Sequence, residues 1–204
     1  WDLRGQLYTS VFLVPLAEIP VDLPPGCRPV SVGRYGIVGI AWVSYEPDGV
    51  LAYSELMSTL LVRRGLRLMP TITHIWVDND ISRDGGRRLW GIPKQLAKFA
   101  FSGVGPGTAM RVPAHFSASV DDGPIADGTV RTRLWLPGRW PLGFRLVQWL
   151  DGKAKVSPVS SRARLGIGRA TFVADPTGPL AFLAGRRPLL SATVADFRMS
   201  FGQR

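Results

Sequence analysis

WVDNDISRDGGRRLWGIPKQLAKF, residues 76–99, contains a lysine that directly follows a proline inside an apolar run. The chain has 25 basic residues, and only four of them are lysines: Lys94, Lys98, Lys153 and Lys155. Arginine keeps its proton in proteins, whereas a buried lysine can become a neutral, nucleophilic amine. The lysine at position 94 therefore suggests a catalytic role as a nucleophilic amine. The alternative is a solvated lysine at the start of a helix.

The rest of the chain is predicted to be mostly β, with few short helices. Its 23 glycines and 17 prolines are spread throughout, which favours short strands joined by turns. One short helix is predicted from Pro93 to Lys98, because proline is tolerated in a first helical turn. The pattern predicts strands at 8–14, 36–45, 50–63, 71–77, 99–104, 110–120, 129–136, 168–174 and 189–201. Segments 15–29 and 137–165 are predicted to be irregular, within one domain over 1–204.

Composition limits the cellular setting and the cofactors. No apolar run approaches the ~18 residues of a membrane span, and the first residues carry no signal-peptide pattern, so a cytoplasmic protein without membrane association is expected. The single cysteine, Cys27, cannot form an internal disulfide. With two histidines and no H-E-x-x-H or calcium-loop pattern, no metal and no other cofactor are expected.

The net charge of +10 raises the question of nucleic-acid binding. Phosphate contacts need clustered basic residues, but the arginines occur singly or in short pairs such as Arg63-Arg64 and Arg186-Arg187. We therefore expect no nucleic-acid partner. A mild preference for anionic small molecules is the better inference.

Two segments resemble signatures of the acetoacetate decarboxylase superfamily. Residues 76–99 show an aromatic-x-D-N segment, then G-R, then a P-K pair, and LAYSELM at 51–57 is similar to the second signature. The closing segment 179–202 is similar in outline. The resemblance implies a closed, cone-shaped antiparallel β-barrel with an apolar interior, wrapped by additional sheet. Family members assemble, so a homo-oligomer, a dimer or larger, is also expected.

The resemblance also implies roles for two residues. In the decarboxylase, the lysine after the proline forms a Schiff base with the substrate ketone, which makes Lys94 the candidate nucleophile. The amine must lose its proton first, and burial in an apolar cavity promotes that loss; acetoacetate decarboxylase is itself the established example of such activation. Glu55, on a strand expected to face the cavity, is the candidate acid/base or substrate-orienting carboxylate.

Some positions depart from the family pattern. Gln95 stands where the decarboxylase has a second lysine, and the upstream segment YGIVGIAWVSY, expected to carry a cavity carboxylate, is uncharged. The family's substrate-binding arginine falls near Arg4. The candidate substrate-binding residues are Tyr53, Gln95, Trp76, Trp90, Arg4 and Asp121. The alternatives are core packing for the tryptophans and a simple turn for Asp121.

Three functions remain open at this point. The first is an imine-forming enzyme that decarboxylates, condenses or dehydrates a small oxo acid through Lys94 and Glu55. The second is a non-decarboxylating enzyme of secondary metabolism that cyclises or dehydrates a polyketide-like substrate by general acid/base catalysis, with Glu55 as the leading acid and Asp121 and Asp122 behind it. The third is a barrel that binds a ligand without chemistry.

Overall fold

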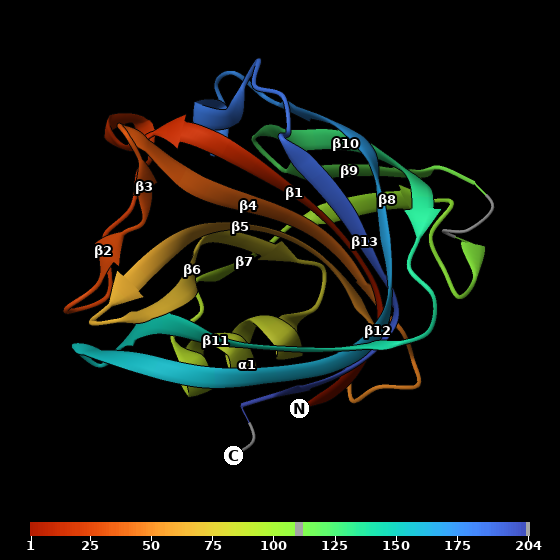
Figure 1. Ribbon diagram of the computed structural model, residues 1–204, viewed down its shortest axis with the longest axis horizontal. Coiled ribbons are helices and arrows are strands. Elements are labelled where there is room, and N and C mark those ends of the chain that lie inside the picture. The colour runs from red at the N-terminus through yellow and green to blue at the C-terminus, as the bar shows by residue number, and fades with distance from the viewer. Residues whose placement is uncertain (109–111, 203–204) are drawn as a thin grey trace.

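The computed structural model describes residues 1–108 and 112–202. Most of the described residues lie in strands, which confirms the mainly β prediction (Figure 1). The strands are β1 Asp2–Pro15, β2 Arg28–Pro29, β3 Ser31–Val32, β4 Tyr35–Tyr45, β5 Tyr53–Arg64, β6 Arg67–Val77, β7 Lys94–Leu96, β8 Lys98–Ser102, β9 Ala114–Val120, β10 Gly123–Trp135, β11 Trp140–Leu150, β12 Lys153–Ala174 and β13 Leu190–Phe201. One α-helix, α1 Asp80–Trp90, and the 3-10 turns η1 Leu16–Glu18 and η3 Ala181–Leu183 complete the described elements. No described helix has the length and apolar character needed to span a membrane.

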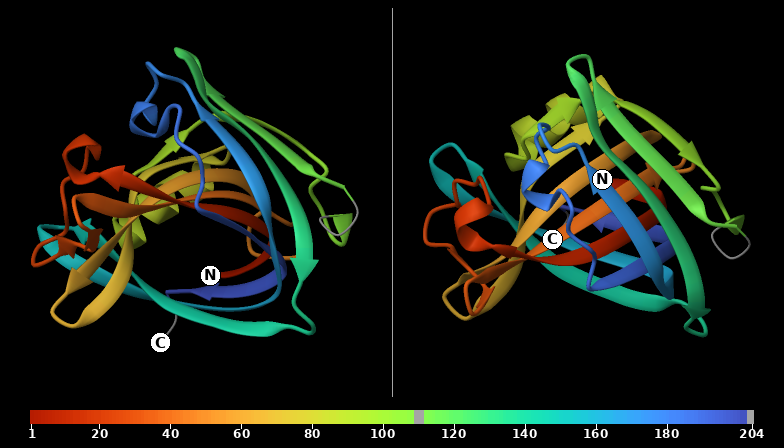
Figure 2. Two further views of the ribbon diagram at one scale, coloured as in Figure 1. Left: turned by 45° about the horizontal axis from the view of Figure 1, so that its top comes forward. Right: turned by 90° about the horizontal axis from the view of Figure 1, so that it is seen from above.

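The described strands belong to one sheet, in the order β7-β6-β5-β4-β1-β13-β12-β10-β9-β8, with β11 attached to β12. The β6–β7 pair is parallel and the other pairs are antiparallel. The long strand β12 pairs with β11 along its first part and with β10 along its last part. The sheet therefore divides at β12. It is also strongly curled, so that β11 returns toward β6 and one face of the sheet is concave (Figure 2).

The closed antiparallel barrel implied by the resemblance is wrong in two respects: the sheet is mixed, and no backbone ladder closes it between the described strands β6 and β11, which lie next to each other. The side-chain amide of Gln148 provides hydrogen bonds between them instead. Gln148 Oε1 accepts hydrogen bonds from Thr71 Oγ1 at 2.7 Å and from the Ile72 amide at 2.8 Å. Gln148 Nε2 donates to the Ile72 carbonyl at 3.1 Å. The buried amide of Gln148 thus takes the place of a strand-to-strand backbone pair where the expected barrel would close.

Gln148→Ala is expected to lower the free energy of unfolding by about 1–3 kcal/mol, because it leaves the buried Ile72 amide and carbonyl without partners. Gln95→Ala is the matched control, since Gln95 is an exposed glutamine in a strand, and its effect should stay within about 0.5 kcal/mol. Urea unfolding of the three proteins measures both values. Equal stabilities for the two variants would contradict this role of Gln148.

Neighbouring residues along β4, β5 and β6 point to opposite faces of the sheet. On one face, Trp42, Leu56 and Trp76 lie side by side, and Trp42 stacks on Phe116 of β9 at 5.3 Å between ring centroids. On the other face, Glu55 lies beside Val43 and Val77. The first face forms the larger hydrophobic core against β8–β10, and the second is the concave face.

The helix predicted from Pro93 to Lys98 is wrong. The helix lies earlier, at Asp80–Trp90: Asn79 caps it by accepting a hydrogen bond from the Ser82 amide at 2.9 Å, and Gly91 ends it with a left-handed φ of 67°. Pro93 is therefore a residue that follows a helix end, a common place for proline. Lys94 begins the strand β7.

The irregular segment predicted at 137–165 is also wrong, because β11 and the first half of β12 form a long hairpin there. The turn is Asp151-Gly152, and both residues have positive φ values, 49° and 74°, as a tight two-residue hairpin requires. This D-G pair is the sequence signal that indicates the hairpin. In the predicted strand 110–120, residues 110 and 111 lie outside the described residues, and the described part contains β9 at Ala114–Val120.

Candidate active site

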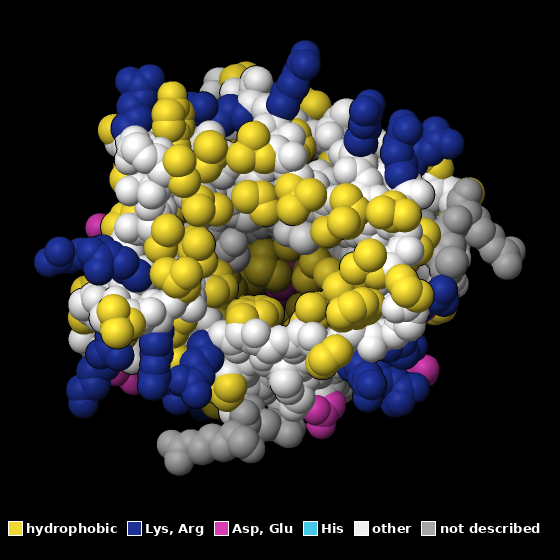
Figure 3. Space-filling view, in the orientation of Figure 1, with side chains coloured by type: hydrophobic (Ala, Val, Ile, Leu, Met, Phe, Trp, Pro, Cys, Tyr) yellow, Lys and Arg dark blue, Asp and Glu magenta, His cyan; other side chains and the backbone are white. Residues whose placement is uncertain are grey.

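The concave side of the curled sheet contains a cavity of about 290 Å³. Its walls come from β1, β4, β5, β6, β11, β12 and β13 together with Trp90 and Ile92, and they are mostly aliphatic and aromatic. Figure 3 looks into a hollow ringed by hydrophobic side chains, with the Lys and Arg side chains toward the periphery of the molecule. Among the described lining residues, Lys94 and Glu55 are the two with charged side chains.

Lys94 is buried, with 5% of its side chain exposed, and its amine lies among three oxygen atoms. Nζ donates to Glu55 Oε2 at 2.8 Å, to Ser82 Oγ at 2.9 Å and to the Tyr53 hydroxyl at 3.3 Å. Nζ also lies 4.9 Å from the centre of the Tyr53 ring. Three partners match the three N–H groups of an ammonium, so the charge is fully hydrogen-bonded although it is buried.

The backbone around Lys94 is fixed by the end of α1. Gly91 turns the chain, and Lys94 then pairs with Ile75 in the parallel β6–β7 ladder, which places both side chains on the cavity face. Arg87 Nε donates to the Lys94 carbonyl at 2.6 Å. The lysine stem passes over Gly86, where an added Cβ would lie 2.9 Å from Lys94 Cδ. Arg87 therefore orders the backbone at the site through the Lys94 carbonyl, while the partner of Glu55 is the Lys94 amine.

Two tyrosines surround Glu55. Tyr45 donates from its hydroxyl to Glu55 Oε1 at 3.3 Å, and its ring stacks on Tyr53 with 4.3 Å between centroids. Burial, and then the nearby Glu55 charge, raise the pKa of Tyr45 and of Tyr53 well above the ordinary 10.0. Both hydroxyls therefore stay protonated beside the Lys94–Glu55 pair.

These raised tyrosine pKa values predict a loss of stability in alkali. In the unfolded chain Tyr45 and Tyr53 lose their protons near the ordinary value of 10.0, while in the folded protein they keep them. Since the unfolded state binds fewer protons, the free energy of unfolding falls as the pH rises above 10.0. Urea unfolding at increasing pH measures this slope. The double variant Tyr45→Phe/Tyr53→Phe should show a shallower slope, and an unchanged slope would contradict the assignment.

The structure brings four of the sequence-predicted residues together at the cavity: Lys94, Glu55, Tyr53 and Trp90. Trp90 lies edge-on against Phe201, with 4.7 Å between ring centroids. Trp76 and Gln95 do not line the cavity. They pair with each other across β6 and β7 and point to the face opposite Ile75 and Lys94. Trp76 is buried in the larger core, and Gln95 is exposed.

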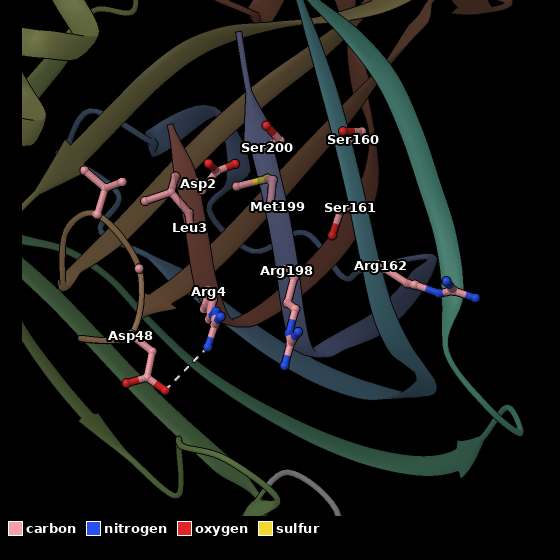
Figure 4. Close-up of a pocket in the computed structure, with 12 residues that line it drawn as sticks. Asp2, Leu3, Arg4, Asp48, Ser160, Ser161, Arg162, Arg198, Met199 and Ser200 are labelled. Atoms are coloured by element: carbon pink, nitrogen blue, oxygen red, sulfur yellow. Dashed lines mark ion pairs between the residues drawn. The ribbon is translucent and has the colours of Figure 1, made fainter. Parts of the chain in front are cut away.

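Arg4 also points away from the cavity. It lies opposite Arg198, which in turn lies opposite Arg162, so three arginines cross β1, β13 and β12 in one row on the outer face of the sheet. Figure 4 shows this outer groove, where Arg4 Nη1 is 3.7 Å from Asp48 Oδ2. Leu3, the neighbour of Arg4, is the residue that lines the cavity.

Asp121 lies at an exposed turn, where Lys98 Nζ donates to its Oδ1 at 2.8 Å. This hydrogen bond, and then the Lys98 charge, lower the pKa of Asp121. Neither Asp121 nor the adjacent Asp122 is among the cavity residues. The geometry at this turn agrees with the alternative reading of Asp121 as an ordinary turn residue.

Sequence reasoning missed Ser82 and Tyr45. Ser82 lies in the first turn of α1, within hydrogen-bond distance of Lys94 Nζ. The sequence predicts the helix at Pro93–Lys98 instead, so it gives no reason to expect Ser82 near Lys94. Tyr45 ends the uncharged strand that was expected to supply a carboxylate, and it lies directly opposite Tyr53. The turn sequence Glu46-Pro47-Asp48-Gly49 in the loop between the two strands is the signal that could have indicated this pairing.

Residues 9–137 match the family model described as acetoacetate decarboxylase (ADC). The chain belongs to the acetoacetate decarboxylase family. The matched region includes both Glu55 and Lys94. Among curated protein sequences, no significant match to this chain is found.

Solved structures of this family share the fold. An acetoacetate decarboxylase aligns with a TM-score of 0.71 at 12% identity, covering 98% of this chain and 86% of that chain. The acetoacetate decarboxylase from Legionella pneumophila aligns with a TM-score of 0.68 at 15% identity, covering 100% and 86%. The enduracididine biosynthesis enzyme MppR complexed with pyruvate aligns with a TM-score of 0.70 at 18% identity, covering 100% and 88%. At these identities the likeness shows the fold, which confirms the decarboxylase-like architecture.

Proposed function

We propose that this protein is an enzyme that forms a Schiff base between Lys94 and a carbonyl substrate. The observation that carries the proposal is the position of Lys94 Nζ, which borders an apolar cavity and lies 2.8 Å from the Glu55 carboxylate. Family membership supports enzyme activity on an oxo substrate. The structural relative MppR has been solved with pyruvate and with the condensation product of pyruvate and imidazole 4-carboxaldehyde, which supports a carbonyl substrate for this chain.

The amine needs to be neutral before it can attack. Transfer of a proton from Lys94 Nζ to Glu55 Oε2 along their hydrogen bond produces an amine and a carboxylic acid, both uncharged. The transfer creates no new charge in the apolar surroundings, where an isolated charge would be costly. The Tyr45 hydroxyl stays protonated and donates to the other carboxyl oxygen, so it holds Glu55 in position in either state.

The neutral Nζ attacks the carbonyl carbon to form a carbinolamine. Glu55 returns a proton to the leaving oxygen, which departs as water and leaves a protonated imine. The imine withdraws electrons from the adjacent carbon. A C–H proton on that carbon can then pass to Glu55 while its electron pair moves into the enamine. The same electron sink would serve condensation, dehydration or loss of carbon dioxide.

Exchange of hydrogen for deuterium tests the proposal without knowledge of the natural substrate. Benzylacetone, an apolar methyl ketone, is incubated with the protein in deuterium oxide, and NMR follows the hydrogens beside its carbonyl. The proposal predicts catalysed exchange that Lys94→Met abolishes and that Lys98→Met, at an exposed lysine, leaves unchanged. Exchange that survives in Lys94→Met would overturn the Schiff base.

A second candidate function is acid–base catalysis without an imine, in which Glu55 protonates a carbonyl or leaving oxygen to cyclise or dehydrate a larger substrate. The burial of Glu55 in a mostly apolar wall favours it, since apolar surroundings suit a carboxyl group that donates a proton. This candidate predicts that Lys94→Met keeps most activity and that Glu55→Gln loses it. Binding of benzylacetone without exchange in any variant would indicate a barrel that binds ligands only.

A further inference from the structure

We propose that the substrate of this cavity is an uncharged aldehyde or ketone with an apolar body, and not an oxo acid. This inference rests on the proposed function, because it assigns a substrate class to the same site. It follows from three features of the described residues: the charge balance of the cavity, the position of the arginines and the state of the hydroxyl groups in the wall.

The charges in the cavity already balance. Lys94 and Glu55 are the charged residues among the described lining side chains, and they pair with each other at 2.8 Å. A substrate carboxylate would enter as an extra negative charge near Glu55, and the described lining residues offer no second cationic side chain to receive it. Burying an ionised carboxylate without a partner costs far more than burying a neutral carbonyl group. The neutral substrate is therefore strongly favoured.

The arginines that could receive a carboxylate lie on the other side of the sheet. Arg4, Arg162 and Arg198 form the row on the outer face, and the cavity-facing residues of the adjoining row are Leu3, Met199 and Ser161. Because side chains alternate between faces along each strand, the Arg4 side chain could face the cavity only if the pairing of β1 shifted by one residue. Gln95 brings no charge, and it points away from the cavity as well.

The hydroxyl groups of the wall agree with a neutral ligand. Thr9 and Thr59 turn their hydroxyls to the carbonyls of Ile40 and Gly39 and so present their methyl groups to the cavity. Ser161 Oγ is buried and has no hydrogen-bond partner in the described structure. A single hydroxyl can satisfy one neutral polar atom of a ligand, but it does not neutralise a carboxylate.

The size of the cavity sets the scale of the substrate. Its volume of about 290 Å³ lies at the lower end of the roughly 300–1,000 Å³ usual for small-molecule sites. A compact hydrophobic carbonyl compound fits this space better than an extended chain. Benzylacetone and benzylpyruvate are suitable ligands for a test, since they share one apolar body and differ by a methyl group in place of the carboxylate.

Isothermal titration calorimetry of these two ligands tests the inference. We expect benzylacetone to bind at least about tenfold more tightly than benzylpyruvate, in the unmodified protein and also in Lys94→Met, where no imine can form. Equal or tighter binding of benzylpyruvate, or no binding of benzylacetone, would overturn the substrate class. The two proposals can fail separately. If benzylacetone binds more tightly than benzylpyruvate but neither the unmodified protein nor Lys98→Met catalyses deuterium exchange, the Schiff base is refuted and the substrate class is supported.

Introducing a cationic side chain into the cavity wall provides the reciprocal test. Met199 lines the cavity and lies directly opposite Ser161 across β12 and β13. Met199→Arg should shift the ratio of the two dissociation constants by about tenfold or more toward benzylpyruvate, because the guanidinium supplies the missing partner. Met199→Gln changes polarity without adding charge and should leave the ratio close to that of the unmodified protein. The same ratio in both variants would contradict the charge argument.

Discussion

Lys94→Met is expected to abolish ketone exchange and to lower the free energy of unfolding by about 3–5 kcal/mol. The activity is lost because methionine has no amine to form the imine. The stability is lost because Glu55, with 3% of its side chain exposed, is left as a buried carboxylate without its cation. NMR exchange rates and urea unfolding measure the two effects separately.

The stability effect has its own control. In the double variant Lys94→Met/Glu55→Leu the unpaired charge is gone, so much of the lost stability should return, as is found when buried ion pairs are replaced by apolar side chains. Lys98→Met removes an exposed lysine and should leave stability within about 0.5 kcal/mol. If Lys94→Met were as stable as the unmodified protein, the buried ion pair of Lys94 and Glu55 would be refuted.

Glu55→Gln is expected to slow ketone exchange by about 10²–10⁴-fold, the usual contribution of a general acid–base group. Glutamine keeps the size and the hydrogen-bonding capacity of the side chain but cannot accept the proton from Nζ or from the substrate carbon. Imine formation itself should persist at a reduced rate, because Lys94 is still present. The NMR assay therefore shows slow exchange, while chemical trapping of the imine continues.

The control for Glu55→Gln is Asp121→Asn, which neutralises an exposed carboxylate outside the cavity. Its exchange rate should equal that of the unmodified protein. A Glu55→Gln variant that exchanges at the full rate would remove Glu55 from the mechanism. A variant that loses trapping as well as exchange would show that imine formation depends on Glu55 more strongly than proton removal from the substrate carbon does.

The presence of Lys94 and Glu55 in one cavity could be anticipated from sequence, because both lie in the segments that carry the family resemblance; their direct ion pair is a finding of the structure. The strand predicted at 50–63 corresponds to β5, Tyr53–Arg64, and a residue's face in a strand follows from its position. This alternation predicts that Glu55 and Leu56 point to opposite faces of the sheet, and that Lys94 and Gln95 do so as well. It likewise predicts that Trp76 points away from the cavity, because its neighbour Ile75 lines the cavity and Trp76 is buried in the larger hydrophobic core.

Other features depend on contacts between distant segments, and local patterns do not reveal them. The side chain of Gln148 bridges to Ile72, which is 76 positions away in sequence. Pro93 fits either the first turn of a helix or the residues after one, and the caps at Asn79 and Gly91 decide between them. Arg4 has the charge expected of a substrate-binding residue, but the register of β1 turns it to the outer face.

Borohydride trapping tests the central claim most directly, because reduction turns a transient imine into a permanent bond at the lysine that formed it. The protein is treated with benzylacetone and borohydride, digested, and its peptides are mapped by mass spectrometry. We predict one irreversible adduct on Lys94, with Lys98, Lys153 and Lys155 unmodified. Full recovery of unmodified Lys94, or adducts spread over the exposed lysines alone, would contradict a buried nucleophilic amine at this site.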